Sequence, residues 1–122
     1  MTDCSPPFFR SLSSQADWAD ARSRSEEQPV LLYKHSSACP VSGNADTEMQ
    51  QLAEEEDLPI YKLVVQESRA LSDEIADTLG VRHETPQAIV LDQQEPVFDA
   101  SHFDVTAETI RAVLPSATMS AE

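Results

Sequence analysis

The chain has 122 residues, which is long enough for one domain to bury a hydrophobic core without disulfide staples. Its 22 acidic and 8 basic residues give a net charge of −14 at pH 7, which argues against nucleic acids and anionic membranes as partners, because both bind basic surfaces. No apolar run approaches the ~18 residues of a membrane-spanning helix, and residues 1–10 lack the features of a secretory signal, so we expect an acidic cytoplasmic protein.

The first half of the chain predicts a tail, a helix and a strand–helix–strand unit. Residues 30–33 are a continuous apolar run, which is typical of a buried, parallel strand. From Pro40 onward apolar residues recur at helical spacing, and proline is well tolerated in the first turn of a helix. In chain order we expect a loosely ordered tail (1–12), a short helix (14–25), a strand (30–33), a polar loop (34–38), a helix (40–57) and a strand (60–65).

The second half of the chain predicts a helix, a hairpin and a last helix. Ser68 is a suitable N-cap, and Gly80 stands where the C-cap of the same helix is expected. Pro86 precedes an apolar run, which turn-forming residues separate from a partner strand. In chain order we expect a helix (69–79), a strand (87–91), a turn (92–96), a strand (97–98), a helix that begins at Asp104 or Thr106, and a loosely ordered tail (116–122).

This order of elements predicts an α/β fold. A βαβ unit followed by a ββα unit is the core of the thioredoxin fold, here with an extra N-terminal helix. We therefore expect one thioredoxin-like domain over residues 1–122, with a four-stranded mixed sheet flanked by helices. Two residues support this prediction: Cys39 lies between the first core strand and its helix, and Pro86 lies directly before the third core strand.

Cys39 is the candidate nucleophile. The thiolate is the form that attacks disulfides, and a helix N-terminus lowers the pKa of a thiol through unpaired N–H groups and a partial positive charge. In the predicted helix the N–H groups of Val41 and Ser42 would face the sulfur. Lys34 and His35, just upstream, are candidates to add positive charge. The alternative is that Cys39 is an unreactive, buried residue at a helix start.

Ser42 stands where a two-cysteine redox motif carries its second cysteine, so the motif is C-x-x-S. Without that second thiol, a mixed disulfide on Cys39 must be resolved by an external thiol, and a low-molecular-weight thiol is the natural choice. The other cysteine, Cys4, lies in the expected tail and is interpreted as incidental. The alternative role for Cys4 is that of a distant resolving or regulatory thiol.

Residues on either side of the predicted hairpin are further candidates for substrate binding. We expect a cis peptide bond before Pro86, so that the backbone of Thr85 faces the sulfur and pairs with the backbone of a substrate. The alternative is an ordinary proline at a strand entry. Ser101 and His102 precede the last helix, whose N-terminus can bind a carboxylate, although a plain capping loop is an equal alternative. The three histidines lack metal-ligand spacing, so we expect no metal.

Three segments, KHSSACPVS, SDEIADTLGVRHETPQAIV and ASHFDVT, resemble the bacillithiol-system YtxJ family, the monothiol bacilliredoxins. They match in order and spacing from about residue 30 to 114. The resemblance implies a thioredoxin-like oxidoreductase with catalytic residues Cys39, Pro40, Ser42 and Pro86. The chain departs from the family at Ala38 and in the turn 92–95, which lacks the expected glycine.

The same resemblance implies that Cys39 removes bacillithiol from mixed disulfides on client proteins, in a general stress role. Bacillithiol is then a co-substrate, its carboxylates have a candidate seat at Ser101 and His102, and no cofactor is bound. Asp104 would repel those carboxylates, so His102 is the better candidate. Two alternatives stay open. One is a non-catalytic thioredoxin-like stress or binding module with a sensor cysteine; the other is a glutathione-linked monothiol glutaredoxin, whose usual C-G-F-S motif is absent.

Overall fold

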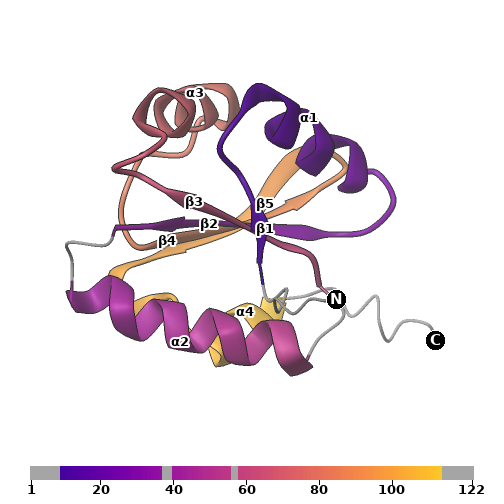
Figure 1. Ribbon diagram of the computed structural model, residues 1–122. Coiled ribbons are helices and arrows are strands. Elements are labelled where there is room, and N and C mark those ends of the chain that lie inside the picture. The colour runs from indigo at the N-terminus through magenta and orange to yellow at the C-terminus, as the bar shows by residue number, and fades with distance from the viewer. Residues whose placement is uncertain (1–8, 37–39, 56–57, 114–122) are drawn as a thin grey trace, which may run out of the picture.

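The computed structural model describes residues 9–36, 40–55 and 58–113, and for residues 40–42, 55 and 103 it describes the backbone alone. A five-stranded mixed sheet lies between two layers of helices (Figure 1). The helices α1 and α3 cover one face of the sheet, and α2 and α4 cover the other. The predicted α/β architecture is confirmed.

The elements follow one another as expected from the sequence, with one extra strand and one short 3-10 turn. They are β1 (Arg10–Ser11), α1 (Gln15–Arg24), β2 (Val30–His35), α2 (Pro40–Glu55), β3 (Ile60–Val64), α3 (Arg69–Leu79), β4 (Gln87–Asp92), β5 (Glu95–Ser101), η1 (His102–Asp104) and α4 (Ala107–Val113). Within the described ranges no helix is both long and apolar enough to cross a membrane.

The strand order is β1-β3-β2-β4-β5. The strand β2 lies at the centre, parallel to β3 and antiparallel to β4. The strand β5 completes an antiparallel hairpin with β4, while β1 pairs in parallel with β3 at the other edge. Because β2 is paired on both sides, the chain that leaves its carboxyl end starts from a fixed position.

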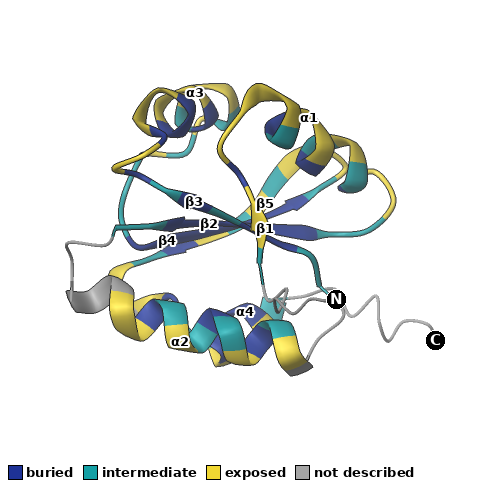
Figure 2. Ribbon diagram, viewed as in Figure 1, coloured by how far each residue is buried: buried dark blue, intermediate teal, exposed yellow. Residues whose placement is uncertain are grey.

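The core consists of two layers, one on each face of the sheet. Alternate residues of β2 point to opposite faces. Leu31 and Tyr33 therefore pack with the buried side chains of α2 and α4, whereas Val30 and Leu32 pack with Trp18 and the α1–α3 layer. Figure 2 shows the same division, with buried strands and helices that are buried only on the side that faces the sheet.

Residues of the α1–β2 connection hold the hairpin turn between β4 and β5. Gln93 and Gln94 have φ angles of 57° and 65°, the left-handed region that favours glycine in a two-residue turn. The N–H of Gln93 donates to the carbonyl of Ser25 at 2.8 Å, and the N–H of Gln94 donates to Ser25 Oγ at 2.9 Å. These contacts account for a tight turn that lacks the expected glycine.

Three of the expectations about local structure are wrong. The hairpin turn is residues 93–94 rather than 92–96, and its second strand is Glu95–Ser101 rather than residues 97–98. The sheet has five strands rather than four, since Arg10 and Ser11 form β1 and Leu12 is 1% exposed, so a loose tail does not extend to residue 12. Lys34 and His35 belong to β2 rather than to a polar loop. A two-residue strand is too short to show an alternating pattern, and a lysine in a buried strand contradicts the usual preference of that residue for solvent.

Candidate functional site

The first turn of α2 is next to Cys39 in the sequence. Pro40 opens this helix, while Cys39 itself lies outside the described residues, as does Cys4. A helix leaves the N–H groups of its first turn without intrahelical acceptors, so those of Val41 and Ser42 have none within α2. No acidic residue lies in this first turn, and its partial positive charge is therefore not offset from within the turn.

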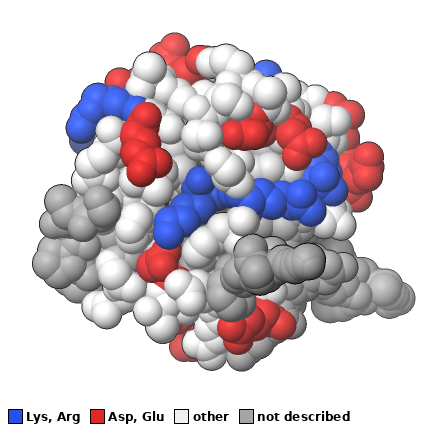
Figure 3. All heavy atoms as spheres, in the orientation of Figure 1, with Lys and Arg blue, Asp and Glu red and all other residues white. Residues whose placement is uncertain are grey.

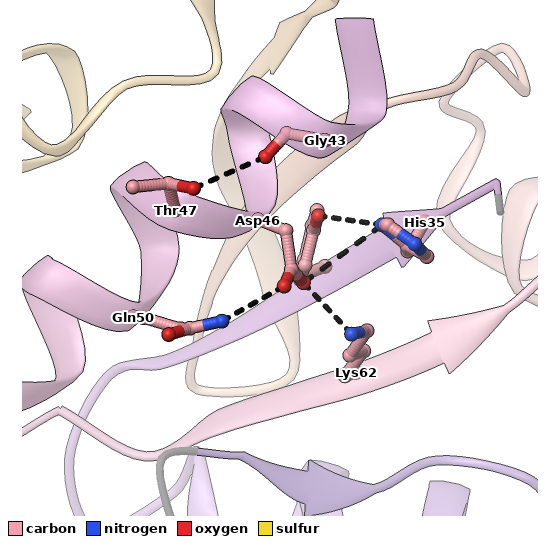
Figure 4. A network of polar contacts seen from close by, with 7 residues as sticks. His35, Gly43, Asp46, Thr47, Gln50 and Lys62 are labelled. Atoms are coloured by element: carbon pink, nitrogen blue, oxygen red, sulfur yellow. Dashed lines mark hydrogen bonds and ion pairs between the residues drawn. The ribbon is translucent and has the colours of Figure 1, made fainter. Parts of the chain in front are cut away.

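A polar network beside the second turn of α2 ties this helix to the sheet (Figure 4). Lys62 Nζ, on β3, lies 2.7 Å from Asp46 Oδ1, and Gln50 Nε2 donates to Asp46 Oδ2 at 2.9 Å. His35 Nδ1, at the end of β2, lies 3.8 Å from Asp46 Oδ1 and 2.9 Å from the hydroxyl of Tyr33. The network therefore ties the second turn of α2 to the carboxyl end of β2 and the middle of β3.

Asp46 and Lys62 are the charged pair of this network, and the surroundings of His35 disfavour a charge on its imidazole. Burial raises the pKa of Asp46, but the hydrogen bond and the charge of Lys62 outweigh burial, so this pKa lies below its ordinary value. Burial, and then the charge of Lys62, lower the pKa of His35 below its ordinary value. The negative charge of Asp46 acts in the opposite direction but does not outweigh them. The expectation that His35 adds positive charge to the site is corrected for this reason.

Aromatic rings hold Lys62 in addition to the carboxylate. Its Nζ lies 5.1 Å from the centre of the Phe9 ring and 5.9 Å from that of Tyr33, both within the range of cation–π attraction. On the face shown in Figure 3, Lys and Arg side chains form a band across the middle, with acidic side chains above and below it, and a separate basic patch lies at the upper left. The band stands out because the chain as a whole is strongly acidic.

Lys34 points to the face of the sheet opposite α2. It is 1% exposed, and its Nζ donates to the carbonyl of Ser72 on α3 and to His83 Nδ1, at 3.2 Å in each case. Burial lowers the pKa of Lys34 to about 8. The expectation that Lys34 adds charge beside the start of α2 is therefore corrected, because its ammonium lies among the side chains of the other layer.

Hydrogen bonds on both sides hold the segment that leads into β4. The peptide bond between Thr85 and Pro86 is cis, which confirms the prediction. Gln87 Nε2 donates to the carbonyl of Arg82 at 2.8 Å, and the N–H of His102 donates to the carbonyl of Pro86 at 2.9 Å. The backbone around Thr85 is thus fixed relative to both β4 and the turn after β5.

Three of the predicted site residues, Pro86, Ser101 and His102, lie close together at one end of the sheet. Lys34 of β2 pairs with Gln87 of β4, which in turn pairs with Ser101 of β5. His102 follows directly, and its Nε2 lies 3.2 Å from Glu84 Oε1. The structure therefore brings the Pro86 segment, Ser101 and His102 together, at the end of the sheet where β2 leads towards α2.

The N-terminus of the last helix is occupied by another part of the protein. The helix begins at Ala107, whose N–H donates to Glu48 Oε1 of α2 at 2.9 Å, and Thr106 Oγ1 accepts a second N–H of this helix. Ser101 ends β5 and His102 opens η1, so neither belongs to α4. The expected carboxylate seat at this helix is corrected, because the carboxylate of Glu48 fills it.

Asp46, Lys62 and Glu48 are the residues that sequence reasoning missed. The sequence does indicate that Lys62 has a charged partner, because it is a single lysine within the apolar run of a predicted buried strand and a buried charge requires a partner. The partner comes from a different element in each case, and no local pattern indicates it. Among the described residues no three His, Cys, Asp or Glu side chains gather where they could hold a metal ion.

The chain is similar to known proteins with this fold. The family model described as Monothiol bacilliredoxin BrxC matches residues 10–110. A solved structure described as a thioredoxin-fold protein and candidate oxidoreductase is 34% identical, with a TM-score of 0.78 over 86% of this chain and 92% of the other. A mutant thioredoxin from Halobacterium salinarum is 21% identical, with a TM-score of 0.72 over 93% and 95%. A thioredoxin from Fasciola hepatica is 16% identical, with a TM-score of 0.70 over 85% and 94%. The two thioredoxins show the fold alone.

Proposed function

The chain belongs to the monothiol bacilliredoxin BrxC family, and we propose that it removes bacillithiol from mixed disulfides on client proteins through Cys39. One observation carries the proposal: the family match spans residues 10–110 and so includes the motif Cys39-Pro40-Val41-Ser42, which enters α2 at Pro40. A thiol redox role follows from the family and the fold. Bacillithiol as the leaving group and co-substrate is the proposed part.

In the first proposed step, the thiolate of Cys39 attacks the bacillithiol sulfur of a protein–bacillithiol disulfide. A new disulfide forms between Cys39 and bacillithiol, the old one breaks, and the client leaves as a thiolate that takes a proton from water. In the second step, the thiolate of a free bacillithiol attacks the sulfur of the bound one. Bacillithiol disulfide leaves, and Cys39 is released as a thiolate.

The start of α2 supports Cys39 as the nucleophile. The N–H groups of Val41 and Ser42 and the partial positive charge of the helix end favour a thiolate over a thiol. The same groups stabilise the Cys39 thiolate as the leaving group of the second step. Ser42 excludes an internal disulfide within the motif, and an external thiol is therefore required.

The proposal assigns client binding to the backbone before β4. The segment 82–86 is held in place by hydrogen bonds to Arg82 and Pro86, so the backbone of Thr85 can pair with an extended client segment at low cost in conformational entropy. Bacillithiolated proteins are thus the proposed macromolecular partners.

Mass spectrometry of the intact protein tests this function. Wild type, Cys39→Ser and Cys4→Ser are each incubated with bacillithiol disulfide and, in parallel, with glutathione disulfide. We expect one adduct on wild type and Cys4→Ser, formed faster with bacillithiol disulfide, and none on Cys39→Ser. An unreactive Cys39 would contradict the proposal and favour a binding module, while faster reaction with glutathione disulfide would favour a glutathione-linked enzyme.

A further inference from the structure

A groove of about 350 Å³ lies between α2 and the junction of β5 with α4. Asn44, Thr47 and Glu48 of α2 form one wall, and His102 and Thr106 form the other. This volume lies at the lower end of the range for small-molecule sites in proteins. The groove is therefore large enough for part of a small ligand, and too small for a folded partner.

The rest of the structure holds both walls of the groove in place. His102 has a φ of 55°, in the left-handed region, where residues other than glycine are uncommon. Its N–H donates to the carbonyl of Pro86, and its Nε2 lies 3.2 Å from Glu84 Oε1. On the other wall, Glu48 Oε1 accepts from the N–H of Ala107. A ligand would therefore find these groups already oriented.

The chemistry of the lining favours hydroxyl groups and amines. The lining carries an amide, two hydroxyls, an imidazole and a carboxylate, and it includes the buried side chains of Ala45 and Val105. The Thr47 hydroxyl donates to the carbonyl of Gly43 and the Thr106 hydroxyl donates to Thr109 Oγ1, so both face a ligand as acceptors. No Lys or Arg is among the described residues that line the groove. Glu84 faces His102, and Glu48 is itself a carboxylate, so an anionic group would meet like charge. Neutral hydroxyls and ammonium groups of a ligand would find hydrogen-bond acceptors in the groove.

We propose that this groove binds the hydroxyl-rich, amine-bearing part of the low-molecular-weight thiol, an inference that rests on the proposed function. Asn44 follows Pro40 by four residues, about 6 Å along a helix axis, so a ligand in the groove extends towards the first turn of α2. A sugar joined to a cysteine has the required chemistry, with hydroxyls on the sugar and a free amine on the cysteine. Any carboxylates of such a thiol point to solvent rather than into the groove.

Two disulfides test the proposal. Bacillithiol disulfide carries an amino sugar on each half, whereas cystine carries amines and carboxylates without hydroxyls. The rate constant for adduct formation on Cys39 is measured by intact-protein mass spectrometry, with each disulfide, for wild type and for Asn44→Ala and Thr47→Ala. Thr78→Ala, an exposed position on α3, is the matched control.

We expect each of the two groove substitutions to slow the reaction with bacillithiol disulfide by about three- to tenfold, the effect of one hydrogen bond, and to leave the reaction with cystine unchanged. Thr78→Ala should change neither rate. Equal rates of wild type with both disulfides, equal losses with both, or no loss with either would overturn the groove assignment. A wild-type protein that reacts with neither disulfide would overturn the proposed function itself, and the groove assignment with it.

Discussion

Lys62 Nζ lies 2.7 Å from Asp46 Oδ1, which joins the middle of β3 to the second turn of α2. The side chains of both residues are about one-fifth exposed, at 23% and 20%, so water screens this pair less than a fully exposed one. The pair matters for the site because Asp46 is the first acidic residue of α2. Lys62 compensates a negative charge that would otherwise oppose the positive end of the helix.

Substitution of Lys62 by Met is expected to raise the pKa of Cys39 by about half a unit. The uncompensated carboxylate of Asp46 would lie about two turns into α2 and would disfavour a second negative charge at the helix start. The pKa is measured from the pH dependence of Cys39 alkylation by iodoacetamide, in a Cys4→Ser background.

Asp46→Asn is the reciprocal variant and should lower the same pKa, because it leaves the cation of Lys62 uncompensated. The double variant should return close to the wild-type value, as expected for two residues that act as a pair. Shifts of the same sign in both single variants would show that they act through local structure rather than through charge.

Lys34→Met is expected to raise the free energy of unfolding by about 1–3 kcal/mol at pH 7, since it removes a buried ammonium with no carboxylate within 4 Å among the described residues. The imidazole that it leaves behind keeps a partner, because Ser72 Oγ lies 3.1 Å from His83 Nδ1. Urea denaturation at pH 7 measures the difference.

The pH dependence of this difference is the sharper test. The pKa of Lys34 is about 8 in the folded protein and 10.5 when unperturbed, so between these values the unfolded chain binds more protons. Wild type therefore gains stability relative to Lys34→Met as the pH rises from 8 to 10.5, and the advantage of the variant shrinks. A difference that is constant from pH 7 to pH 10 would contradict the burial of a charged Lys34.

Gln94→Gly is expected to raise the free energy of unfolding by about 0.5–1 kcal/mol. The φ of Gln94 is 65°, which glycine adopts without steric cost, and its backbone bond to Ser25 Oγ does not depend on the side chain. Gln94→Ala is the matched control, because it removes the same exposed side chain but keeps Cβ. Thermal unfolding should rank Gly above wild type, with no gain for Ala.

Glu48→Ala is expected to lower the free energy of unfolding by about 1 kcal/mol, or the Tm by roughly 3–6 °C, because the N–H of Ala107 loses its acceptor. Glu48→Gln retains a carbonyl oxygen at the same place and should lose less. Equal losses in the two variants would indicate that the charge of Glu48, rather than its hydrogen bond, stabilises the start of α4.

The fold could be predicted because its signals are local. The apolar runs of β2, β3 and β4, the helical spacing after Pro40 and the C-cap at Gly80 each depend on a few neighbouring residues, and together they leave little choice of topology. The cis bond before Pro86 followed from that topology. The strand β1 escaped prediction because two residues carry no period, and its pairing with β3 joins segments far apart in the sequence.

The site was predicted less well because its contacts connect distant segments. Lys34 and His35 looked like free cations in a loop, but their electrostatics depend on His83, Asp46 and Lys62, which come from other elements. The carboxylate of Glu48 lies 59 positions from the N–H that it caps, and it removes a binding site that the sequence had suggested. Such contacts between distant residues follow from packing, and no single segment of the sequence indicates them.

Transfer of bacillithiol from a client to Cys39 is tested most directly by a single-turnover assay on a bacillithiolated client peptide, followed by mass spectrometry, with wild type and Cys39→Ser at stoichiometric concentration. We predict that wild type releases the free peptide thiol and carries one bacillithiol on Cys39, which added bacillithiol then removes, while Cys39→Ser does neither. Release of the peptide thiol by Cys39→Ser at the wild-type rate, or no transfer of bacillithiol to wild type, would contradict the proposed transfer.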